Sequence, residues 1–211
     1  MLSELRFAAA LVYSPRGQSA ESKKSRVQVR DPLKRGDPRF LQLACARLRT
    51  FLPHDLVAEF LPADGVLVPT PRRAPQYSKD SLWPAQLLAE ALVRCGFGDR
   101  VLPCLARVSA VPKSAFSAPG HRPDPVHHYE SMRVRLDLLD RPRRVTLIDD
   151  FVTRGATLLA PASRLQEALP GAEIRAFVLV RTMGLVAEIE SIGAPCAGTI
   201  RCDGKVVERH P

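Results

Sequence analysis

The residues best suited to chemistry lie in one uninterrupted stretch, residues 144–157. A short, mostly apolar run from Val145 to Ile148 predicts a buried strand, and Asp149 and Asp150 follow it directly. Open α/β sheets bind ligands at the carboxyl ends of their strands, so both carboxylates are expected to face a ligand. Carboxylates accept hydrogen bonds from sugar hydroxyls, which makes this pair a candidate ribose site.

A phosphate-binding turn is predicted immediately after the two acids. It comprises Thr153, Arg154, Gly155, Ala156 and Thr157, which open the next helix. A helix N-terminus offers N–H groups without intrahelical partners and a positive dipole, both of which favour a bound phosphate. Gly155 allows close backbone approach, and the two threonine hydroxyls add donors. The alternative interpretation is a buried strand with ordinary loop acids, followed by a helix capped by Thr153.

This order of strand, paired acids and Thr-x-Gly-x-Thr turn resembles the binding motif of type I phosphoribosyltransferases. The wider chain looks like their ComF-type (competence protein F) branch, although Arg154 stands where many relatives have a second threonine. The resemblance implies that Asp149 and Asp150 act as catalytic residues on 5-phosphoribosyl diphosphate or a nucleoside monophosphate. It also implies Mg²⁺ near these two aspartates, without requiring direct ligation by a side chain. The implied reaction transfers the phosphoribosyl group to a nitrogenous acceptor and releases diphosphate.

The same resemblance places diphosphate-binding residues in two loops. Val66 to Pro69 predicts a strand, and Thr70, Arg72 and Arg73 follow it in a segment similar to the ComF-type Val-Pro-x-x-x-Arg pattern. The alternative interpretation of this loop is a proline-stiffened turn with two exposed arginines. Residues 109–126 show no clear period and form a candidate lid, in which Lys113 and Arg122 are the candidate closing cations.

The elements that position these residues follow from periodicity and capping signals. Strands are expected over 6–13, 66–69, 101–108, 145–148 and 174–180, helices over 38–51, 81–94 and 158–169, a loop over 14–37 and a hairpin around Asp203-Gly204. The sequence therefore predicts an α/β fold with a mostly parallel twisted sheet flanked by helices, an N-terminal strand-helix extension and a C-terminal β-hairpin. Residues 1–64 are expected to form a basic extension packing on the core, and residues 65–211 the phosphoribosyltransferase-like domain with its hairpin.

Positive charge is concentrated near the N-terminus. The 211-residue chain has a formal net charge of +9, and residues 16–49 contain ten basic side chains against three acidic ones. This segment is predicted to bind nucleic acid weakly, to attract an anionic substrate, or to be a solvated surface. No aromatic residue lies between Arg16 and Arg35, which disfavours stacking on single strands.

Composition restricts the class of protein. At 45% hydrophobic content the chain can bury a substantial core, and its longest apolar runs have the length of strands, so no membrane span is expected. Five cysteines without a Cys-x-x-Cys pair disfavour both a disulfide framework and a zinc site. The N-terminus lacks a secretory signal, so a cytoplasmic location is expected, and a homodimer is an open expectation.

Two other functions remain open at this stage. One is a non-catalytic phosphoribosyltransferase-fold module that binds nucleotides or regulates DNA uptake or processing, because a fold alone does not establish a reaction. The other is a phosphohydrolase built on Asp149 and Asp150, which leaves the Thr-x-Gly-x-Thr turn unexplained. The identity of the acceptor does not follow from the sequence.

Overall fold

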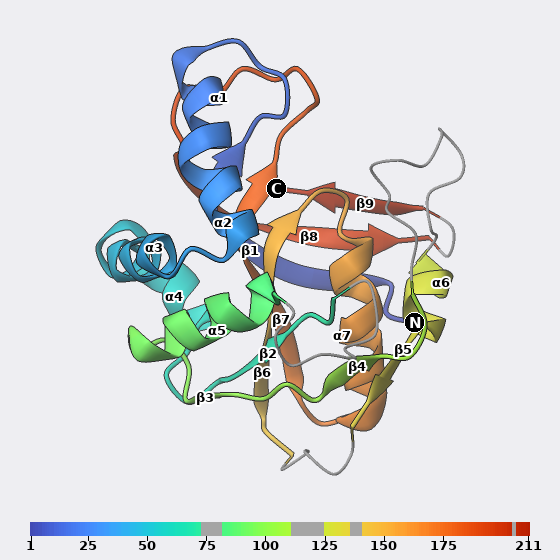
Figure 1. The fold of residues 1–211 in the computed structure, drawn as a ribbon. Coiled ribbons are helices and arrows are strands. Elements are labelled where there is room, and N and C mark those ends of the chain that lie inside the picture. Colours follow the sequence, from blue (N-terminus) through green and yellow to red (C-terminus); the bar gives the residue numbers. More distant parts are fainter. Residues whose placement is uncertain (73–81, 111–124, 136–140, 204–205) are drawn as a thin grey trace.

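The fold is built around one seven-stranded mixed sheet with the strand order β3-β2-β6-β7-β1-β8-β9 (Figure 1). The computed structural model describes residues 1–72, 82–110, 125–135, 141–203 and 206–211. The strands are β1 (Glu4–Tyr13), β2 (Val66–Pro69), β3 (Arg100–Val101), β4 (Leu105–Arg107), β5 (Met132–Val134), β6 (Arg144–Val152), β7 (Glu173–Thr182), β8 (Gly193–Cys202) and β9 (Val207–His210). The helices are α1 (Ala20–Lys24), the π-helical η1 (Ser25–Arg30), α2 (Asp31–Arg35), α3 (Pro38–Phe51), α4 (His54–Phe60), α5 (Pro84–Arg94), α6 (Pro125–Glu130) and α7 (Ala156–Ala168).

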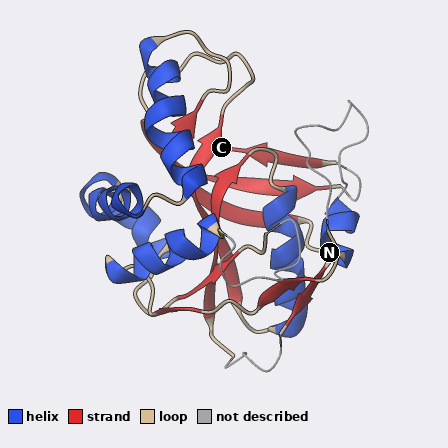
Figure 2. Cartoon of the chain, viewed as in Figure 1, coloured by secondary structure: helices blue, strands red, loops and turns tan. Residues whose placement is uncertain are grey.

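Helices cover both faces of the sheet (Figure 2). On one face, the apolar side of α7 packs on alternate strand residues such as Phe7 and Leu147. On the other, α3, α4 and α5 cover the intervening residues, among them Ala8 and Ile148. Strands between two helical layers are buried on both sides, which explains their nearly continuous apolar sequences.

The sheet confirms the predicted α/β class, with mostly parallel strands and a C-terminal hairpin. β3, β2, β6, β7 and β1 pair in parallel, whereas β8 and β9 are added antiparallel. The predicted N-terminal strand is present and lies inside the sheet between β7 and β8. Residues 1–64 therefore share one sheet with the later strands, and the domain boundary at residue 64 stays a prediction.

The loop predicted over residues 14–37 is wrong, because residues 20–35 are helical throughout. The segment runs from α1 through η1 to α2 and lies at one end of the molecule in Figure 1. Proline at position 32 has no N–H to donate and its ring crowds the carbonyl four residues earlier. The wider π-helical turn lies directly before it, and the Asp31 N–H bonds back to the Arg26 carbonyl. Gly36, at φ 65°, ends the helix.

Other predicted elements are confirmed with shifted limits. The expected strand over 101–108 is two strands, because β3 joins the large sheet while β4 pairs with β5 in a separate two-stranded sheet. The helix expected from Ser81 begins at Pro84, with Ser81 outside the described residues. None of the five cysteines, all within the described ranges, forms a disulfide. No helix in the described part of the chain has the length and apolar character that crossing a lipid bilayer requires.

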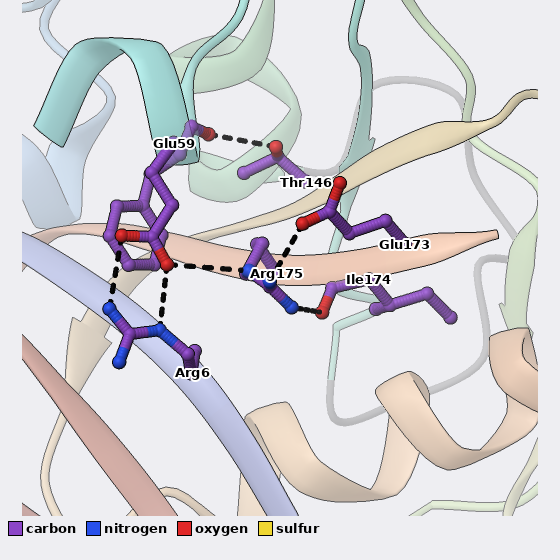
Figure 3. Close-up of polar contacts among 7 residues, drawn as sticks. Arg6, Glu59, Thr146, Glu173, Ile174 and Arg175 are labelled. Atoms are coloured by element: carbon purple, nitrogen blue, oxygen red, sulfur yellow. Dashed lines mark hydrogen bonds and ion pairs between the residues drawn. The ribbon is translucent and has the colours of Figure 1, made fainter. Parts of the chain in front are cut away.

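A polar network fixes α4 against the amino ends of strands β1, β6 and β7 (Figure 3). The Glu59 carboxylate accepts from the Arg6 guanidinium at 2.7 Å and lies 3.5 Å from Arg175 Nε, which links β1 to β7. Thr146 Oγ1 donates to the Phe60 carbonyl at 2.8 Å and adds β6. The pairs are partly solvent-exposed, so each contributes about 1 kcal/mol or less. They hold the strand ends opposite the acids of residues 149 and 150.

Candidate functional site

Asp149 and Asp150 lie within the carboxyl-terminal half of β6, which pairs with β7 as far as Val152 instead of ending at Ile148 as predicted. Residues 145–148 are buried, whereas both aspartates are partly exposed. The neighbouring β2 ends at Pro69, level with Ile148, and Thr70 N–H donates to the Ile148 carbonyl at 2.9 Å. The structure therefore brings Thr70 to the acid pair, at the carboxyl ends of two adjacent parallel strands.

Asp149 is held in an environment that disfavours its negative charge. Burial, followed by repulsion from Asp150, raises the pKa of Asp149 to about 8. The Thr70 side chain hydrogen-bonds to the carboxyl and, with the charge of Lys34, partly opposes this rise. Thr70 itself is fixed, because its carbonyl accepts from Trp83 Nε1 at 2.7 Å. This environment favours the protonated form of Asp149, and a cation or a hydrogen-bond donor that reaches the carboxyl favours the ionised form.

Asp150 is neutralised by a residue from the N-terminal helix. Lys34 Nζ lies 2.5 Å from Asp150 Oδ2 and 4.6 Å from the centre of the Phe151 ring. The Lys34 side chain is 54% exposed while that of Asp150 is 13% exposed, so the ammonium covers the carboxylate from the solvent side. Tyr13 packs edge-on against the same Phe151 ring at 5.7 Å. The helix over residues 20–35 thus forms one wall of the candidate site.

Sequence reasoning missed Lys34 as a site residue. It lies 116 positions before Asp150, in the basic segment of residues 16–49, for which the sequence leaves nucleic-acid binding, attraction of an anionic substrate and a solvated surface open. The available signal was the local excess of positive charge, which gave no indication of which lysine meets the acids.

The turn after β6 requires a glycine at position 155. Gly155 adopts φ 105°, a region that disfavours residues with a side chain, and a Cβ there would lie 2.6 Å from the Ile200 side chain. Its carbonyl accepts from Leu158 and Leu159 N–H, both at 2.9 Å, which starts α7. Thr153 and Arg154 are exposed, and Ala156 and Thr157 are partly exposed. α7 therefore begins at Ala156, a few residues after Asp150 in the chain, and its first N–H groups have no intrahelical partner.

The predicted diphosphate residues are only partly brought together. Thr70 reaches Asp149, as described above. Arg72 instead donates from Nη1 to the Leu82 carbonyl at 3.4 Å, and its own carbonyl accepts from Arg107. Arg73, Lys113 and Arg122 lie outside the described residues.

Comparisons with known proteins add little beyond this geometry. No family model and no curated protein matches the sequence. Adenine phosphoribosyltransferase from Thermoanaerobacter pseudethanolicus aligns with 72% of this chain and 84% of its own, at 16% identity and a TM-score of 0.39. The enzyme of the same name from Leishmania tarentolae aligns over 86% of both chains, at 19% identity and a TM-score of 0.34. Likeness at this level assigns neither a ligand nor a reaction to this chain.

Proposed function

We propose that this chain binds 5-phosphoribosyl diphosphate with magnesium and transfers its phosphoribosyl group to a nitrogenous acceptor, releasing diphosphate. The supporting observation is the acid pair at the carboxyl end of β6, beside a helix that starts at Gly155. Ribose hydroxyls need acceptors and a 5-phosphate needs N–H donors. The two sets lie within a few residues of each other on one strand and the helix that follows it.

Each group has a role in this proposal. Asp149 and Asp150 accept from the ribose hydroxyls and orient the anomeric carbon. Residues 153–157 hold the 5-phosphate. The bond from the anomeric carbon to the diphosphate oxygen breaks while a bond to the acceptor nitrogen forms, so positioning and stabilisation of the leaving charge supply the catalysis.

The two carboxylates fit a magnesium ion that is shared with the substrate. Magnesium in phosphate sites is held by one or two carboxylates together with substrate oxygens. Within the described residues, no group of three or more His, Cys, Asp or Glu side chains could hold a metal ion, which favours this shared arrangement. When bound, the ion would neutralise charge on the diphosphate.

Lys34 fits the proposal as a cation that changes partners. Its ammonium contacts Asp150, and the side chain is long and more than half exposed. Once ribose hydroxyls bind Asp150, Lys34 can pair with an anionic oxygen of the diphosphate. Before the ligand binds, the Lys34–Asp150 ion pair offsets the repulsion between the neighbouring carboxylates of Asp149 and Asp150.

Calorimetry with 5-phosphoribosyl diphosphate, with and without Mg²⁺, tests the proposal. The double variant Asp149→Asn, Asp150→Asn is expected to bind at least about tenfold more weakly, because charge-assisted hydrogen bonds are lost. Asp64→Asn is the matched control, since this aspartate pairs with Arg144 at the start of β6. Absence of binding by the folded wild-type protein would contradict the proposal. Release of diphosphate in the presence of a panel of nitrogenous bases and amines separates an enzyme from a module that only binds.

A further inference from the structure

A pocket lies between the turn after β6 and the C-terminal strand. It has a volume of about 400 Å³ and is lined by Thr153 and Arg154 from the turn and by residues of β9 and its approach, including Arg209 and His210. Small-molecule sites have volumes of roughly 300–1,000 Å³, so this pocket exceeds what a single ion needs. The sequence predicted β9 only as half of a hairpin, without a role in the site.

The pocket is lined by two arginines, Arg154 and Arg209, and by one carboxylate, Glu208. Arg6, Arg144, Arg175 and Arg201 each form an ion pair with a nearby acid. In contrast, the described residues include no ion-pair partner for Arg154, Arg181 or Arg209. Glu208, which also lines the pocket, lies 3.8 Å from His210 Nε2.

Arg209 is held in place by main-chain contacts at the ends of two strands. Its Nη1 donates to the Val152 carbonyl at 3.3 Å and its Nη2 to the Thr182 carbonyl at 2.9 Å. Val152 lies next to Thr153, so these bonds fix the guanidinium beside the turn. Its Nε is buried and forms no hydrogen bond within the described structure. Arg181, level with Val152 on the adjacent strand, adds a second positive charge nearby.

The surroundings of Arg209 oppose its positive charge. Burial and the charge of Arg181 lower the pKa of Arg209. The negative charge of a bound phosphate would act against both effects. Guanidinium groups are also well suited to phosphate, because their planar N–H groups match two oxygens at once.

We infer that Arg209 and Arg154 form a two-sided clamp for a phosphate monoester, with β9 supplying one side and the turn the other. The inference rests on the proposed function for identifying that monoester as the 5-phosphate of a ribose. It adds the C-terminal hairpin to the binding site and makes the site selective for phosphorylated over unphosphorylated sugars.

Binding of ribose 5-phosphate, ribose and inorganic phosphate, measured by calorimetry, tests the clamp. Arg209→Met and Arg154→Met are each expected to weaken the binding of ribose 5-phosphate roughly ten- to a hundredfold, because each removes a charged hydrogen-bond donor. The affinity of Arg209→Lys for ribose 5-phosphate should lie between those of the methionine variants and the wild type. Arg201→Met is the control, because Arg201 lies in the same hairpin and pairs with Glu4.

A second readout separates binding from support of the turn. The ³¹P resonance of bound ribose 5-phosphate, followed against pH, should show a lower second phosphate pKa than the free ligand. In Arg209→Lys it should stay low, whereas in Arg154→Met it should move toward the free value. A role restricted to holding the turn leaves the bound phosphate pKa unchanged.

The outcomes distinguish the clamp from the proposed function. Wild-type affinity in folded Arg209→Met, or equal binding of ribose and ribose 5-phosphate by the wild-type protein, overturns the clamp. If Arg209→Met does not fold, unchanged affinity in Arg154→Met overturns it instead. If ribose 5-phosphate binds through these arginines while 5-phosphoribosyl diphosphate does not bind, the clamp stands and the proposed function fails. The reverse pattern refutes the clamp alone.

Discussion

The titration of Asp149 makes the stability of the folded protein depend on pH. The Asp149 pKa of about 8 in the folded protein lies above the ordinary aspartate value of 3.8, so between these pH values the folded protein retains a proton that the unfolded chain has lost. Between these values the unfolded state binds fewer protons, and the stability of the fold falls as pH rises. Asp149→Asn removes the titrating group while preserving its shape.

We therefore expect Asp149→Asn to stabilise the protein in a pH-dependent way. Near pH 4 the variant and the wild type should melt together, and at pH 8 the variant should be more stable by about 1 kcal/mol or more, which corresponds to about 2–4 °C or more. Thermal unfolding monitored by circular dichroism across this range measures the difference. Asp64→Asn, with its 72% exposed side chain, should show no such trend. A difference that stays constant with pH would contradict the assigned pKa.

At the scale of elements, the N-terminal helix depends on a single carboxylate. Glu188 accepts from the N–H groups of Gln18 and Ser19 at 2.6 and 2.7 Å and from the Ser22 hydroxyl at 3.0 Å. These bonds lower the pKa of Glu188 to about 2. They tie the start of α1 to the connection between β7 and β8, and so position the helix that carries Lys34.

Glu188→Ala is accordingly expected to loosen residues 20–35 without unfolding the sheet. Hydrogen exchange of these amides should accelerate, while amides of β6 and β7 keep their protection. Because the pKa of Glu188 is depressed, its contribution is complete above about pH 4.5 and disappears as pH falls toward about 2. Glu190→Ala, two residues away and also exposed, is the control. Equal exchange in the two variants would show that the carboxylate does not hold the helix.

Elements with a strong local signal could be predicted from the sequence, and elements set by distant contacts could not. Asp37 and Pro38 predict the start of α3, and in the structure the Asp37 carboxylate accepts from the N–H groups of Arg39 and Phe40. The helix before it has a local cap, since the Ser19 side chain accepts from Ser22 N–H, but Pro32 and many Ser, Lys and Arg residues suggest a loop. Its start is also held by Glu188, which accepts from the Ser19 N–H and lies 169 residues beyond it. The acid pair and the turn were predictable because they are contiguous, whereas Lys34 and Arg209 reach the site only through the tertiary fold.

At the scale of the whole molecule, the basic segment divides into two groups of residues. Lys34 contacts Asp150, Arg26 holds the carbonyls of Ser14 and Gly17, and Arg30 pairs with Asp31. Lys23, Arg35 and Arg39 are exposed and form no ion pair within the described residues. Reversing the charge of the whole segment is therefore expected to remove the Lys34–Asp150 pair together with any nucleic-acid binding.

The triple variant Lys23→Glu, Arg35→Glu, Arg39→Glu separates the two roles. Wild-type protein, with its net charge of +9, is expected to bind DNA or RNA weakly and without sequence preference. Binding should weaken steeply with salt, because phosphate contacts release counterions. The triple variant should lose nucleic-acid binding and keep its affinity for 5-phosphoribosyl diphosphate. Lys34→Glu, in contrast, should weaken binding of 5-phosphoribosyl diphosphate. Fluorescence anisotropy of labelled DNA or RNA at low and moderate salt measures nucleic-acid binding. If the wild-type protein shows no binding at low salt, the positive charge serves only to steer anionic ligands.

The place of β1 in the sheet also bears on how the chain is made. The ribosome releases this strand well before either of its partners, because Phe7 pairs with Ala176, and Ala8 lies opposite Ala197 on the other side. Until β7 and β8 are made, a strand whose residues 7–10 are buried in the finished fold has neither edge covered. The nascent protein must keep that strand from pairing with other chains during this interval, so cellular yield should depend on elongation speed and on chaperones that shield β1.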